Sequence, residues 1–135
     1  MSLFQKSQTN YEWAEKILPV ENKINSSVHC YYYSCFQLIL HLLESKYNSF
    51  SNGGENSHEK TFIKFFDEFS KDSKLKIDTD TLSDLANFTT IIKIYRIKAD
   101  YRRAFLPKVD YLDMQIKTKG ILTTLTKMYN IPWKI

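Results

Sequence analysis

The sequence contains only two cysteines, three glycines and three prolines among its 135 residues. So few glycines and prolines argue against a turn-rich β architecture and against a disordered or fibrous chain. Cys30 and Cys35 lie five residues apart on one predicted helix, so their side chains point in different directions. A local disulfide or a paired zinc site is therefore unfavourable, and we expect both residues to be reduced thiols in or beside the core.

Long apolar runs are also missing from the sequence. No stretch approaches the roughly 18 apolar residues that a membrane-spanning helix needs. The first ten residues, MSLFQKSQTN, lack the apolar segment of a secretory signal. We therefore expect a cytoplasmic protein that does not enter the membrane.

The local motifs of several enzyme classes are absent as well. The sequence has no Gly-rich phosphate loop and no HExxH, CxxC or GxSxG element, which are the usual signals for nucleotide hydrolysis, zinc proteolysis and serine-hydrolase chemistry. His29, His41 and His58 are scattered along the chain, so we expect neither a metal site nor a cofactor. The net charge of +4 permits contact with phosphate groups, but many ordinary proteins share such a charge.

Apolar and aromatic residues at helical spacing dominate what remains. Hydrophobic residues make up 43% of the chain, including nine Phe and nine Tyr, which is enough to build a core. Their periodicity predicts helices over about residues 9–17, 24–47, 58–69, 79–105 and 109–129. We predict one all-α domain over residues 1–135, with its core at about 10–129. The expected architecture is a four- to five-helix bundle of mostly antiparallel, up-down helices.

The predicted helix 24–47 is apolar on several faces, which indicates a central position in the bundle. Two neighbouring rows carry its apolar side chains: Val28, Tyr32, Phe36, Ile39 and Leu43 in one, and Tyr31, Cys35, Leu38 and Leu42 in the other. A further row, spaced at i+4, is polar and consists of His29, Tyr33, Gln37 and His41. This polar row either finds hydrogen-bond partners on another helix or forms the solvated edge of its own helix.

The other helices carry simpler patterns. A stripe of Phe62, Phe65, Phe66 and Phe69 is expected in the core. Asn56 or Ser57 is the predicted N-cap of this helix, with Glu59 completing a capping box with Asn56. Side chains expected to face inward are Trp13, Ile17 and Leu18 on the first helix, and Leu112, Ile116, Ile121, Leu125 and Met128 on the last. Gly120 interrupts that last helix and predicts a close helix crossing.

Arg96 and Asp100 are spaced to pair on the fourth predicted helix. One interpretation is a surface i, i+4 ion pair worth about 0.3 to 0.5 kcal/mol. The other places Arg96 at the rim of a cleft, where its fork of donors holds a phosphate or a carboxylate. Cations dominate this end of the helix, namely Lys93, Arg96, Lys98, Arg102, Arg103 and Lys108. They suit RNA, but they also suit the negative end of the helix dipole.

Taken in order, four segments resemble the HEPN domain family (higher eukaryotes and prokaryotes nucleotide-binding). They are NSSVHCYYYSCFQLILHLL, NSHEKTFIKFFDEF, YRIKADY and the last long helix, and together they span about residues 10–129. The matching residues are Tyr32, Tyr33, Ser57, His58, Arg96, Ala99, Asp100 and Tyr101. The resemblance implies a HEPN-type bundle that forms a two-fold dimer. It also implies a toxin–antitoxin or defence setting with a small nucleotidyltransferase as partner.

Ribonuclease members of that family carry an Arg that is followed, after four to six intervening residues, by a His. Here those positions hold Tyr101, Arg102 and Arg103, so the motif lacks its imidazole. We therefore favour a non-catalytic homodimeric module that binds a nucleotidyltransferase partner, a nucleotide or RNA. Its expected cleft residues are Tyr32, Tyr33, His58, Arg96, Asp100, Tyr101, Arg102 and Arg103. The alternative is a metal-independent endoribonuclease in which Arg96 stabilises the phosphorane and His58 carries the proton.

Overall fold

The structure, a computed structural model, describes residues 1–50, 53–101 and 104–135. Two of the expected cleft residues, Arg102 and Arg103, lie outside these ranges. The elements are α1 (Leu3–Ile17), a short 3₁₀ turn (Glu21–Lys23), α2 (Ile24–Tyr47), α3 (Ser57–Lys71), α4 (Thr79–Tyr101) and α5 (Lys108–Met128). The described residues contain no strand, which confirms the predicted all-α fold.

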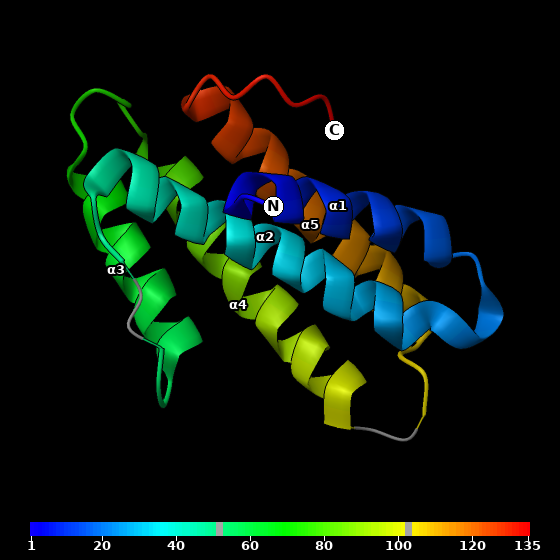
Figure 1. Cartoon of the computed structure of the whole chain (residues 1–135). Helices are drawn as coiled ribbons and strands as arrows, with labels where there is room; N and C mark the ends of the chain where they lie inside the picture. Colours follow the sequence, from blue (N-terminus) through cyan, green and yellow to red (C-terminus); the bar gives the residue numbers. More distant parts are fainter. Residues whose placement is uncertain (51–52, 102–103) are drawn as a thin grey trace.

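The long helices form an antiparallel bundle (Figure 1). α2 runs opposite to α1 and α4, and α5 runs opposite to α4. α3 lies across one end of the bundle, where it packs on α2. The predicted up-down arrangement is therefore confirmed for four helices, while α3 departs from it.

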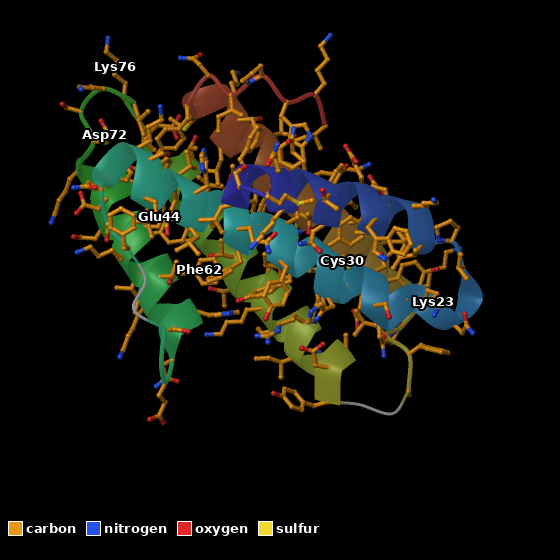
Figure 2. All side chains as sticks on the ribbon, viewed as in Figure 1. Lys23, Cys30, Glu44, Phe62, Asp72 and Lys76 are labelled. Atoms are coloured by element: carbon orange, nitrogen blue, oxygen red, sulfur yellow. The ribbon has the colours of Figure 1, made fainter. Side chains whose placement is uncertain are left out.

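α2 occupies the centre of the bundle because it is apolar on so many sides. Both predicted apolar rows are buried, and Tyr31 and Tyr32 have no exposed surface at all. α2 packs against each of the other four helices. Side chains from α3 extend toward it, as Phe62 does in Figure 2, where its ring packs against the rings of Tyr32 and Phe36.

α1 begins six residues earlier than predicted. Ser2 accepts a hydrogen bond from the Gln5 backbone N–H at 3.1 Å, while the Gln5 side chain accepts one from the Ser2 N–H at 2.9 Å. This capping box starts the helix at Leu3. Trp13 was expected to face inward, but it points outward with 51% exposure, and the Lys16 ammonium lies 5.5 Å from its ring centroid.

The N-cap of α3 lies at Asn56, one of the two predicted positions, but the predicted side-chain bonds do not form. Asn56 has a left-handed backbone (φ 58°) and no side-chain capping bond, so no capping box forms with Glu59. At α4 the carboxylate of Asp78 accepts the Thr81 N–H at 2.6 Å, just before the helix begins at Thr79. In the described residues α4 extends to Tyr101, and residues 104 and 105 are not helical, so the helix ends before the predicted residue 105.

α5 agrees with its pattern only in part. Ile121 and Leu125 are buried as predicted, whereas Leu112 and Ile116 point outward with 37% and 63% exposure. Gly120 marks a close crossing, because a Cβ there would lie 2.9 Å from the ring of Phe88 on α4. Periodicity located the helix correctly, but it did not distinguish a core face from an exposed apolar face.

Candidate functional site

Six side chains from three helices converge on the flank that α2 presents to α3 and α4. We call them the Arg96 cluster: His29, Tyr32 and Tyr33 from α2, His58 from α3, and Arg96 and Asp100 from α4. His29 and Tyr33 are four residues apart on α2, and Arg96 and Asp100 are four residues apart on α4. Each pair therefore lies on one face of its helix. Five of these six were expected cleft residues, although they lie far apart in the sequence.

Arg96 lies at the centre of the cluster. Its guanidinium carbon is 5.0 Å from the ring centroid of Tyr32 and 5.6 Å from that of Tyr33, within the range of cation–π attraction. Its Nε donates to Asp100 Oδ2 at 3.0 Å, and a terminal nitrogen lies 3.5 Å from the Tyr33 hydroxyl. Only 21% of the side chain is exposed, so the guanidinium is held in one orientation.

Asp100 connects Arg96 to His29. One carboxylate oxygen accepts from Arg96, and the other lies 3.3 Å from Nδ1 of His29, whose ring packs 4.6 Å from the ring of Tyr33. The pair that spacing predicted is therefore part of a three-residue chain between α2 and α4. His29 was not among the expected cleft residues, and its only sequence signal was its position one turn before Tyr33.

His58 closes the cluster on the α3 side. Its Nδ1 lies 3.0 Å from the Tyr32 hydroxyl, and its ring stacks on Phe36 with 4.0 Å between centroids. Burial, together with the positive charges of Arg96 and Lys93, holds the pKa of His58 below its ordinary value. Burial also raises the pKa of Tyr32. Both groups are therefore neutral at pH 7.

The polar row on α2 divides between two neighbouring helices. His29 and Tyr33 face α4, as described above. Gln37 accepts a hydrogen bond from the side chain of Asn10 on α1 at 2.8 Å. His41 stacks on Phe4, which is also on α1, with 5.6 Å between ring centroids. The row has partners on other helices, which is the first of the two interpretations.

Tyr101 lies apart from the cluster. Its side chain, at the end of α4, is 80% exposed, and a separation of five residues places it about 140° around the helix from Arg96. Ala99 is buried in the core, and Ser57 accepts a hydrogen bond from Thr61 at its carbonyl. These matching residues therefore shape the helices around the cluster rather than enter it.

Both cysteines are free thiols. Cys35 is fully buried and Cys30 half-buried, and burial raises the pKa of each. Within the described ranges, no group of three His, Cys, Asp or Glu side chains is placed to hold a metal ion. None of the helices there combines the length and apolar character needed to cross a membrane.

Comparison of the chain with protein-family models, curated proteins and solved structures gives no match. The likeness to the HEPN family accordingly rests on the motif residues themselves.

Proposed function

We propose that this chain is a HEPN-like interaction module whose Arg96 cluster recognises a phosphate group of RNA or of a nucleotide. It acts in the cytoplasm as a homodimer beside a nucleotidyltransferase partner, in a toxin–antitoxin or defence system. One observation carries the proposal: the motif residues of three helices meet around a single oriented guanidinium.

The geometry of Arg96 suits recognition of an anion. A guanidinium has five N–H donors in a plane, and here its Nε donates to Asp100 while one terminal nitrogen lies near the Tyr33 hydroxyl. Its two terminal nitrogens can present donors side by side to the oxygens of a phosphate in a bidentate manner. Because the side chain is already fixed against two aromatic rings, binding loses little conformational entropy.

The surroundings of His58 favour binding over cleavage. Its Nδ1 is hydrogen-bonded to the Tyr32 hydroxyl and one face of its ring is covered by Phe36. The second candidate, a metal-independent endoribonuclease, is supported by the position of His58 in the cluster, since His58 and Arg96 both contact the ring of Tyr32. Its lowered pKa would leave the imidazole neutral and able to accept a proton.

The homodimer is supported by an exposed apolar face that α4 and α5 share. Its members are Ile94, Ile97 and Tyr101 on α4, and Val109, Leu112 and Ile116 on α5, each at least 37% exposed. A hydrogen bond of 2.6 Å from Tyr95 to Asp113 joins the two helices. Large apolar side chains exposed on adjacent helices are typical of protein–protein interfaces. The apolar residues of α2, by contrast, are used within the chain.

Incubation of single-stranded RNA with the purified protein in EDTA tests both functions in one sample. The matched control for Arg96→Ala is Lys98→Ala, because Lys98 lies two residues along α4 and points to the opposite side. We expect RNA to be bound intact, with affinity about tenfold weaker in Arg96→Ala and within about twofold in Lys98→Ala. If the wild type cleaves RNA and both Arg96→Ala and His58→Gln abolish the cleavage, the non-catalytic binding module is refuted in favour of the ribonuclease. Wild-type protein that neither binds nor cleaves RNA would refute both RNA recognition and the ribonuclease.

The partner is tested separately. If a nucleotidyltransferase gene lies next to the gene for this chain, its product should co-purify with the chain after co-expression. Failure of the two proteins to associate would remove the partner from the proposal and leave RNA recognition in place.

A further inference from the structure

An open groove lies between α3 and α4, beside the Arg96 cluster. α3 packs chiefly on α2, so the facing flanks of α3 and α4 leave a hollow of about 500 Å³. Phe62, Ile63 and Phe66 form its α3 wall, while Thr89 and Thr90 contribute to the α4 wall. Neither the sequence motifs nor the cluster accounts for this groove.

The interior of the groove is apolar and has few polar groups that need a hydrogen-bond partner on a ligand. Ile63 leaves 63% of its surface exposed there, although it could have been buried by a closer approach of α4. The hydroxyls of Thr89 and Thr90 both donate to the carbonyl of Ala86 within α4, at 2.9 and 3.0 Å. The face of a flat ring therefore packs on these walls without leaving the threonine hydroxyls unpaired, while a polar ring edge stays in the open side of the groove.

The groove lies next to the Arg96 cluster. Phe62 forms part of its wall and also packs 6.2 Å from the ring of Tyr32. Lys93 lines the groove, one helical turn before Arg96. Glu59, which follows His58 on α3, lines the groove as well. A ligand in the groove thus meets one cation and one carboxylate of its lining, with Arg96 one helical turn further along α4.

We propose that the groove between α3 and α4 holds the base of a nucleotide whose phosphate is bound by Arg96 and Lys93. The proposal rests on the phosphate recognition proposed above and adds a separate base subsite to it. The charged residues in and beside the groove, Lys93, Glu59 and Arg96, favour a nucleotide over a fatty acid as its ligand. A nucleotide offers a phosphate to the two cations and ribose hydroxyl donors to Glu59, whereas a fatty acid has no donor for that carboxylate. Stacking of a base on apolar and aromatic walls is tolerant of base identity.

Calorimetric titration with adenosine monophosphate and with ribose 5-phosphate isolates the base, because the two ligands share the sugar and the phosphate. We expect the wild-type protein to bind adenosine monophosphate about tenfold more tightly than ribose 5-phosphate. Thr90→Trp fills the groove, and Ile63→Ser removes part of its wall. Each should bring adenosine monophosphate close to the affinity of ribose 5-phosphate and leave ribose 5-phosphate within twofold. Val20→Ser, at an exposed site in the connection between α1 and α2, should change neither affinity.

The outcomes separate this proposal from the one on which it rests. Equal wild-type affinities for the two ligands would overturn the base subsite and leave the phosphate site standing. Equal losses for both ligands in Thr90→Trp and Ile63→Ser would overturn it too, because the groove would then not be selective for the base. Absence of binding by both ligands to the wild-type protein would refute recognition of a nucleotide phosphate, on which the base subsite rests.

Discussion

Replacement of Glu15 by Gln should destabilise the fold measurably at neutral pH. Glu15 extends from α1 and accepts hydrogen bonds from Tyr11, from Tyr31 on α2 and from Gln115 on α5, at 2.6 to 2.7 Å. The ammonium of Lys119, also on α5, lies 3.0 Å away. In the variant, the amide NH₂ group takes the place of one carboxylate oxygen. The donors that bond to that oxygen in the wild type then face this NH₂ group. With the amide turned one way, Lys119 is left facing another donor; turned the other way, the Gln115 amide must flip to accept, and in both cases Lys119 loses its negatively charged partner.

The pKa of Glu15 sets the magnitude. Partial burial raises this pKa, but the four hydrogen-bond donors outweigh burial and lower it from 4.5 to about 2. A tenfold change in proton affinity is worth about 1.4 kcal/mol, so this fall corresponds to about 3 kcal/mol of stability at pH 7. Because 29% of the side chain is exposed, screening by solvent reduces the expected loss in Glu15→Gln to about 2 kcal/mol.

The pH dependence gives the prediction a second measurable feature. A carboxyl with a lowered pKa stabilises the folded state above its unfolded pKa of 4.5, and this stabilisation is lost as the pH falls toward 2. Urea unfolding of wild type and Glu15→Gln should therefore differ by about 2 kcal/mol at pH 7 and by less than half of that at pH 3. Glu12→Gln is the matched control, since Glu12 is exposed on the same helix, and should change stability by less than about 0.5 kcal/mol. A Glu15→Gln loss no larger than that of the control, or a loss independent of pH, would refute this reasoning.

Three further predictions concern the crossing, the cluster and the dimer face. Gly120→Ala should stabilise the wild-type protein by less than about 0.5 kcal/mol in urea unfolding. In a Phe88→Ala background it should add about 1 kcal/mol, because the clash at 2.9 Å is then gone; equal effects in both backgrounds would contradict the close crossing. NMR titration should show the pKa of His58 below 6.5 and rising in Arg96→Ala, since burial and the Arg96 charge depress it; an unchanged pKa would exclude their proximity. Ile116→Asp should shift the protein from dimer to monomer in sedimentation equilibrium. A wild-type protein that is monomeric at micromolar concentration would refute the proposed dimer.

The sequence was most informative where one physical requirement dominated. α2 was placed correctly at the centre because its two apolar rows leave no position for it except the interior. The start of α1 was predicted six residues too late, although Ser2 and Gln5 have the spacing of a capping box. Leu112 and Ile116 could not be placed from periodicity, because an apolar face for a partner and one for the core have the same spacing. The structure gives no reason why Asn56 caps α3 without its side chain.

The cluster was predicted less completely than the fold. The motif residues supplied Tyr32, His58 and Arg96, and the structure brings these three together. The role of His29 depends on where α4 lies beside α2, which no local pattern specifies, so its contact with Asp100 was not foreseen. The groove between α3 and α4 likewise arises from the angle at which α3 crosses the bundle. Such features depend on tertiary packing rather than on propensity.

An NMR titration of isotope-labelled protein with a short single-stranded RNA tests the central claim most directly, because it shows where the ligand binds. Phosphate recognition by the Arg96 cluster predicts that the Nε–H resonance of Arg96 and the amide resonances of Tyr33 and His58 shift first and saturate together. The same titration of Arg96→Ala should leave Tyr33 and His58 nearly unshifted at equal RNA concentration. Saturable shifts confined to other helices, with the Arg96 resonance unmoved, would contradict the account.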